Sequence, residues 1–140
     1  MDVFDQEARD AVQKEVEEFL DAYHDAMERE GLLSEVDYLD NSDDFFWVPP
    51  GYESAISYDS VMIILKINAP SIQQMKLEKD YLYVYAHSFE IATYTARLIS
   101  TVIDTAGVIN EVTMLETGTV IKRKKGWQLL NGQSRIISNE

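Results

Sequence analysis

The chain has 140 residues, enough for one domain that buries a hydrophobic core without disulfides or a structural metal. It contains no cysteine and two histidines, which excludes disulfides, thiol chemistry and cysteine-ligated zinc and leaves too few ligands for a histidine-rich metal centre. The formal charge of −13 at pH 7 is concentrated in residues 1–44 and repels phosphate backbones and anionic lipids, so we expect no nucleic-acid or membrane partner.

Residues 5–29 predict a long amphipathic helix. Apolar residues recur there at spacings of three and four, with glutamates and aspartates between them. Asp2 or Asp5 can cap the start of this helix, and Gly31 supplies the backbone freedom that ends it. A short second helix is expected over residues 32–39.

An aromatic segment follows a polar turn at residues 40–44. Residues 45–48 predict a short strand, which stops at Pro49 and Pro50 because proline cannot donate a ladder hydrogen bond. Residues 54–57 are expected to resume the pairing after that break.

Residues 58–68 are apolar with a periodicity that fits either a buried helix or a strand. We predict a helix, because Ser57 or Asp59 can cap its start and Pro70 follows its end.

The chain after Pro70 is rich in β-branched and aromatic residues, which predicts strands over residues 72–86, 91–105, 108–123 and 127–138. Strands of this length bend, and Gly118 and Gly132 are the expected places for bulges. A bent antiparallel sheet has a concave face. The pattern therefore predicts an α+β fold in which the N-terminal helices pack in the concave face of a curved antiparallel sheet.

The order of the predicted elements is typical of a known superfamily. The segments most similar to it are residues 19–24 of the first helix, residues 46–48 of the first strand and residues 118–130 at the end. The chain resembles the nuclear transport factor 2-like superfamily and, within it, the SnoaL-like domains. The resemblance covers nearly the whole chain and implies one domain over residues 1–140 with a cystatin-like, cone-shaped fold. It also implies a pocket between the first helix and the sheet, and frequent dimerisation through the outer face of the sheet.

The resemblance leaves the activity open, because the superfamily includes ketosteroid isomerases, polyketide cyclases, dehydratases and domains that only bind or associate. Many SnoaL-like sequences place a histidine on the last strand after the tryptophan. This chain has Asn131 and Gln133 there, which removes a titratable group that acid–base members use.

Candidate pocket residues come from the first helix and the first strand. Tyr23 and Met27 lie one turn apart on the buried face of the helix, and Trp47 lies on the strand, so all three can line a pocket wall. The alternative is that they are plain core, the commoner role of aromatic and methionine side chains. His24 is expected to point away from that face to the surface, and His87 to lie in an exposed turn.

The last strand supplies two amide candidates. If it is regular, Asn131 and Gln133 share a face with Trp127 and Leu129 and point into the concavity. There they can orient a ligand by hydrogen bonds, or instead bond to a neighbouring strand or buried water.

A general base requires a carboxylate in an apolar cavity, where its pKa is raised toward neutrality. The candidates are Asp43, Asp44, Asp104 and Glu116, of which Glu116 is the most interesting. It shares its parity with Met114 and Gly118. An outward, solvated position is the commoner one for glutamate, which is rarely fully buried.

We therefore expect a cytoplasmic homodimer, without metal or cofactor, that binds a small, largely apolar molecule. The start of the chain lacks the pattern of a secretory signal, and its apolar runs are too short to span a bilayer. One alternative is an acid–base enzyme of the isomerase or cyclase type, which requires a carboxylate or tyrosine pair inside the cavity. Another is a non-catalytic association module that uses the threonine-rich outer face of the sheet.

Overall fold

The computed structural model describes residues 3–139 of the chain. The elements in chain order are α1 (Gln6–Glu30), the 3-10 helix η1 (Leu32–Tyr38), β1 (Phe46–Val48), α2 (Tyr58–Asn68), the 3-10 helix η2 (Ala69–Ser71), β2 (Ile72–Ala86), β3 (Ile91–Asp104), β4 (Ile109–Arg123) and β5 (Gly126–Asn139). The predicted α+β class is confirmed, and the helix predicted over residues 58–68 coincides with α2.

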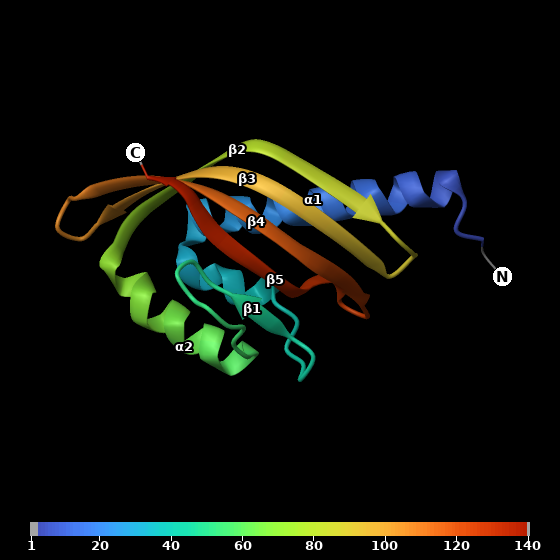
Figure 1. Cartoon of the computed structure of the whole chain (residues 1–140), viewed down its shortest axis with the longest axis horizontal. Helices are drawn as coiled ribbons and strands as arrows, with labels where there is room; N and C mark the ends of the chain where they lie inside the picture. Colours follow the sequence, from blue (N-terminus) through green and yellow to red (C-terminus); the bar gives the residue numbers. More distant parts are fainter. Residues whose placement is uncertain (1–2, 140) are drawn as a thin grey trace.

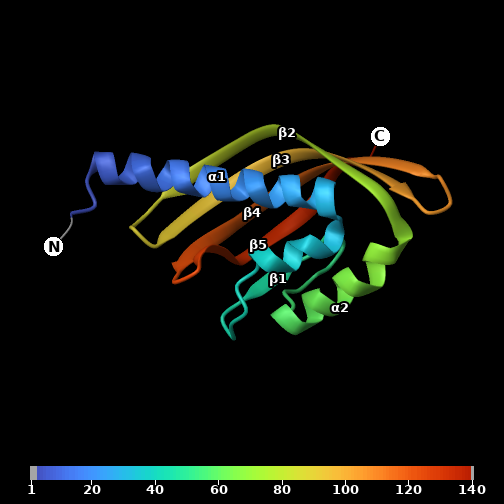
Figure 2. The ribbon, with the colours of Figure 1, turned by 180° about the vertical axis from the view of Figure 1, so that it is seen from behind.

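The five strands form one sheet in the order β1-β5-β4-β3-β2. Strands β2 to β5 pair antiparallel, whereas β1 runs parallel to β5, so the sheet is mixed at its β1 edge. The sheet bends over α1, and α2 lies beside β1 at one end of the concave side (Figures 1 and 2). None of the helices in the described residues is long and apolar enough to cross a membrane.

Helix α1 begins and ends as its sequence predicts. The side chain of Asp5 accepts a hydrogen bond from the Ala8 amide at 2.9 Å, and Gly31 adopts φ +97°, which favours glycine. Its apolar stripe, which includes Val16 and Leu20, is fully buried against the sheet. Burial of each such side chain contributes about 1.5–3 kcal/mol to stability.

The bulges do not lie at the predicted glycines. Gly118 and Gly132 pair with each other in regular register. An added Cβ on Gly132 would lie 2.4 Å from the Thr117 carbonyl oxygen and 2.6 Å from the Trp47 ring. One on Gly118 would lie 2.5 Å from the Asn131 carbonyl oxygen and 3.1 Å from the Tyr94 ring. The two glycines therefore make room for aromatic rings on the concave floor of the sheet.

A bulge does occur nearby, at Leu130. Thr119 pairs with Asn131 and Val120 pairs with Leu129, which leaves Leu130 without a partner on β4. One extra residue inverts the alternation of side chains along β5. The faces on either side of Leu130 are therefore exchanged relative to a regular strand.

Candidate functional site

A cavity of about 330 Å³ lies between the helices and the concave face of the sheet. Small-molecule sites occupy roughly 300–1,000 Å³, so this volume falls at the lower end of their range. Its walls are mostly hydrocarbon and aromatic, and they are formed by Tyr23, Met27, Leu32, Glu35, Trp47, Pro49, Pro50, Tyr52, Val61, Ile64, Leu65, Asn68, Met75, Leu77, Leu98, Ser100, Met114, Glu116 and Ser134. The predicted residues Tyr23, Met27, Trp47 and Glu116 thus meet around one cavity.

The first polar group in this cavity is a tyrosine–glutamate pair. Tyr23, 1% exposed on α1, donates a hydrogen bond from its hydroxyl to Oε1 of Glu35 on η1 at 2.5 Å. Burial raises the pKa of Glu35 from 4.5 to about 7, although the hydrogen bond from Tyr23 lowers it, and the charge of Glu116 raises it further. Burial also holds the pKa of Tyr23 well above its ordinary value. Glu35 can therefore both take up and release a proton near neutral pH, while Tyr23 stays a hydrogen-bond donor.

The second polar group is centred on Glu116 of β4, which is 4% exposed. Its Oε1 accepts a hydrogen bond from the Tyr94 hydroxyl at 3.0 Å and lies 3.3 Å from Nε2 of His24. Burial and the charge of Glu116 raise the pKa of Tyr94 well above its ordinary value. The carboxylate is thus held by two side chains from different elements, β3 and α1.

Glu116 points inward because of its strand parity. Met114 and Gly118 flank it on the concave face, and Ala96 lies opposite it on β3. The small residues at 96 and 118 leave space for the carboxylate and for the Tyr94 ring. Glu116 is therefore buried on the concave face and does not take the outward, solvated position that is commoner for glutamate.

His24 is not at the surface, contrary to the sequence-based expectation. It is 7% exposed and follows Tyr23, so two consecutive residues of α1 are buried. The reason is that α1 lies in a curved sheet, which covers more than one narrow stripe of the helix (Figure 2). His87 is exposed, as expected, and contacts Thr93.

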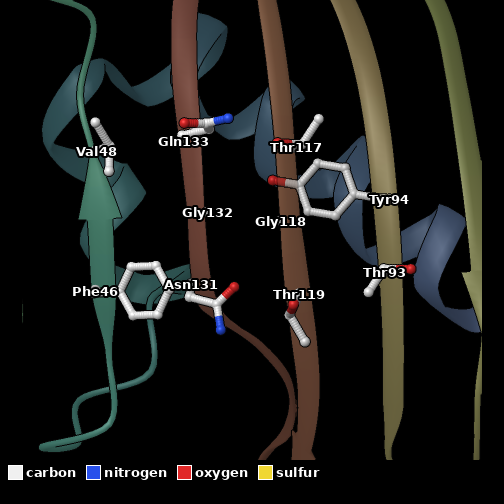
Figure 3. Close-up of a pocket in the computed structure, with 10 residues that line it drawn as sticks. All are labelled: Phe46, Val48, Thr93, Tyr94, Thr117, Gly118, Thr119, Asn131, Gly132 and Gln133. Carbon is white, nitrogen blue, oxygen red and sulfur yellow. The ribbon is translucent and has the colours of Figure 1, made fainter. Parts of the chain in front are cut away.

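The predicted orientation of Asn131 and Gln133 is wrong. Because of the bulge at Leu130, Trp127 and Leu129 are buried whereas Gln133 is exposed and Asn131 is half-buried. Both amides line a hollow of about 360 Å³ on the face of the sheet opposite the helices (Figure 3).

This outer hollow is more open to solvent than the inner cavity and offers fewer groups that can take part in a reaction. Its other side chains come from β1, β3 and β4, and none of them carries a charge at neutral pH (Figure 3). Tyr94 contributes to its wall, but the Tyr94 hydroxyl is committed to Glu116. Proton-transfer groups are therefore concentrated in the inner cavity.

Sequence reasoning missed Glu35 and Tyr94. Tyr94 alternates with Ala92 and Ala96, and this pattern of one large residue between two small ones could have marked a buried tyrosine. Glu35 is one of many acidic residues in the first 44, and no local pattern separates it from its neighbours.

Within residues 3–139, no three or more histidine, aspartate or glutamate side chains are grouped in a way that could hold a metal ion.

No protein-family model matches the sequence, and no curated protein is significantly similar to it. Solved structures are similar in three dimensions. A proposed scytalone dehydratase from Novosphingobium aromaticivorans is 10% identical with a TM-score of 0.78, over 91% of this chain and 85% of that one. A nuclear transport factor 2-like superfamily protein from Salmonella enterica is 13% identical with a TM-score of 0.74, over 89% and 90% of the two chains.

The chain has the nuclear transport factor 2-like fold. A ketosteroid isomerase-like protein from Erwinia carotovora atroseptica shares it as well, with 21% identity and a TM-score of 0.70 over 90% of this chain and 96% of that one. At these identities the likeness concerns the nuclear transport factor 2-like fold alone, and this fold hosts several functions. The function therefore depends on the side chains that line the cavity.

Proposed function

We propose that the inner cavity binds a small, largely apolar molecule and transfers protons to and from it, with Glu35 as the acid–base group. The single observation that carries this proposal is geometric: the carboxyl group of the half-buried Glu35 lies in the wall of an apolar cavity and accepts a hydrogen bond from the buried Tyr23 at 2.5 Å, a setting that raises its pKa to about 7. An acid–base group is most effective when its pKa lies near the working pH. This is the isomerase or dehydratase type of function, which the sequence offered as an alternative to binding alone.

The walls of the cavity support a neutral substrate. Their charged members are Glu35 and Glu116, and no lysine or arginine is among the described residues that form them. An anionic substrate would meet negative charge without compensation. A ketone with one or two rings suits both the apolar walls and the polar groups at one side.

The proposed chemistry moves a proton at carbon. Ionised Glu35 takes a proton from a carbon next to a carbonyl group, and the electron pair of that C–H bond moves toward the carbonyl oxygen to form an enolate. The carboxylic acid form of Glu35 exchanges this proton with water and then protonates the carbon, which restores the carboxylate. Tyr23 orients the carboxyl group through its hydrogen bond.

Deuterium uptake tests this proposal. The neutral ketone 2-tetralone is incubated in D2O with the wild-type protein or the Glu35→Gln variant, and loss of the α-proton signals is followed by NMR. We expect the variant to lose about 100-fold or more of the protein-catalysed rate, because an amide cannot accept the proton. Asp37→Asn is the matched control, since Asp37 is exposed on the same short helix, and it should retain the wild-type rate.

A binding function without catalysis is the second candidate. A thermal-shift series with steroids, polyketides and fatty acids detects it, because a ligand of the folded state raises the melting temperature with the logarithm of its concentration. Two results together would favour binding alone. Ligands would stabilise the protein, and the wild type and Glu35→Gln would exchange the α-protons of 2-tetralone at the same rate.

We also propose a homodimer through the outer face of the sheet. Phe46 is 43% exposed there, and Tyr83 and Tyr85 are each 55% exposed beside Thr93 and Thr95. A second copy would cover these rings. Sedimentation of the wild type and of Tyr83→Glu tests this, and a wild-type monomer at high concentration would exclude the dimer and weaken an association role for this face.

A further inference from the structure

Two buried serines lie on the sheet wall of the inner cavity. Ser100 of β3 is 5% exposed and Ser134 of β5 is 8% exposed, and both line the cavity. Their hydroxyl groups differ in their partners. Oγ of Ser134 accepts a hydrogen bond from Nε1 of Trp47 at 3.1 Å, whereas the hydroxyl of Ser100 has no hydrogen-bond partner within residues 3–139.

The Ser100 hydroxyl is open to the cavity. Among the described residues, the buried side-chain atom that is both unpaired and closed off is Nδ1 of His24. Oγ of Ser100 is unpaired but not closed off, and the space that this residue lines is the inner cavity. A buried hydroxyl requires a hydrogen-bond partner, so the partner of Ser100 has to come from the contents of the cavity.

Hydrocarbon side chains surround Ser100. Leu77 of β2 and Val112 of β4 are its partners across the sheet, and Leu98 lies two residues before it on the same face of β3. In such surroundings an unpaired hydroxyl is unfavourable. An entirely apolar ligand would displace water from Ser100 without replacing the hydrogen bond of that water, so it would bind less well than a ligand with a polar atom there.

Ser100 lies at the opposite end of the cavity from the carboxyl groups. Ala96 of β3 pairs with Glu116, and Ser100 is four residues further along β3 on the same face, which places it about 13 Å away along the strand. Glu35 lies at the Glu116 end, because one turn of α1 contacts both carboxyl groups. The cavity therefore has polar groups at two ends and hydrocarbon between them.

We infer that Ser100 hydrogen-bonds to a second polar atom of the substrate, at the end remote from Glu35. The substrate is then a ketone that also carries a hydroxyl group or a second carbonyl oxygen on its far ring. Ser100 determines specificity and takes no part in the proton transfer. This inference rests on the proposed function, which supplies the ketone at the other end of the molecule.

A matched pair of ligands tests the inference. 6-Hydroxy-2-tetralone carries a hydroxyl group at the end opposite its ketone, and 6-methyl-2-tetralone carries a methyl group there. Thermal shift over a concentration series gives the affinity of each compound for Glu35→Gln and for the double variant Glu35→Gln/Ser100→Ala. We expect the preference for the hydroxyl compound over the methyl compound to fall about fivefold in the double variant, because a hydrogen bond is lost.

The control for ligand binding is Glu35→Gln/Ser134→Ala. It removes the other buried hydroxyl of the cavity, which lies on the strand paired with Glu116 and away from the far ring of the ligand. This variant should keep the preference of Glu35→Gln for the hydroxyl compound.

Stability without any ligand gives an independent test. Because the protein does not use the Ser100 hydroxyl, Ser100→Ala should melt at the wild-type temperature or above it. Ser134→Ala is the matched control, since it leaves Nε1 of Trp47 unpaired, and it should melt about 3 °C lower or more.

Two results would overturn the inference. One is a preference for the hydroxyl compound that is unchanged by Ser100→Ala. The other is a loss of melting temperature in Ser100→Ala as large as that in Ser134→Ala, which would show that the hydroxyl serves the fold. Neither measurement requires proton transfer and the second requires no ligand, so failure here is distinguishable from failure of the ketone exchange, which tests the proposed function.

Discussion

The two ends of helix α1 pack on the same sheet, but the first is surrounded by closely packed hydrocarbon side chains and the second by polar groups beside a cavity. Along its first half, Val12 and Val16 pack into a closed hydrocarbon core with Val120 and Leu129, all at most 4% exposed. Beyond Leu20 the next residues of the same helix are Tyr23 and His24, which meet carboxylates beside a cavity.

This contrast separates stability from function. Hydrocarbon burial at the closed end stabilises the fold without specifying any chemistry. At the open end the buried carboxyl groups and the empty volume both reduce stability, because a buried charge and a missing packing partner are unfavourable. Such features persist where they serve a site, and they occur together around Glu35 and Glu116.

Truncation of the closed end gives the largest expected effect on stability. Leu20→Ala removes a fully buried side chain and should lower the free energy of unfolding by about 2–5 kcal/mol. Met27→Ala, at the cavity wall, should cost less, because that side chain already lacks neighbours on one side. Urea unfolding measures both, and equal losses would break the contrast between the two ends.

At the open end, the free energy of unfolding should depend on pH through Glu35. The pKa of Glu35 is raised from 4.5 to about 7 on folding. Its protonation therefore stabilises the fold fully below about pH 4.5, and this contribution to stability is lost as pH rises through 7. Relative to Glu35→Gln, the wild type should therefore lose up to about 3 kcal/mol between these limits.

The difference between wild type and Glu35→Gln isolates this carboxyl from all other titrating groups. Asp37→Asn should keep the wild-type slope, because Asp37 is exposed. A difference that is independent of pH between 4.5 and 7 would show that Glu35 titrates like an exposed glutamate.

A smaller effect is expected where two glycines admit aromatic rings. Gly132→Ala places a methyl group 2.6 Å from the Trp47 ring and should cost about 1–3 kcal/mol by overpacking. Combined with Trp47→Phe, it should cost less than the sum of the two single changes, because the contact with the ring is relieved while the contact with the Thr117 carbonyl oxygen at 2.4 Å remains. Strict additivity in thermal or urea unfolding would refute this account of the glycine pair.

The smallest effect is expected at an exposed ion pair between α1 and β2. Asp21 and Lys79 form an ion pair at 2.6 Å, but their side chains are 53% and 42% exposed. Asp21→Asn should change the unfolding free energy by about 0.5 kcal/mol or less, and added salt should reduce the effect further. A loss well above 1 kcal/mol would mean that this ion pair contributes to stability more than an exposed ion pair does.

Local signals in the sequence were enough for most of the fold. Asp5 and Gly31 fix the ends of α1, and Ser57 with Pro70 fixes those of α2, because caps and prolines act on the nearest few residues. β-branched and aromatic residues after Pro70 fix the strands for the same reason.

The site was harder to predict because it depends on non-local geometry. One unpaired residue, Leu130, turned Asn131 and Gln133 outward, and no local pattern marks that position. His24 is buried only because the sheet curves around α1, and Glu35 enters the cavity only because the chain reverses after α1 into a short helix.

The carboxyl titration of Glu35 itself reports directly on whether this residue can act as an acid–base group near neutral pH. In protein labelled with ¹³C at glutamate side chains, the signal missing from Glu35→Gln identifies this group. We expect a titration midpoint near pH 7, because burial in the cavity raises the pKa of Glu35. A midpoint near the ordinary value of 4.5 would contradict it.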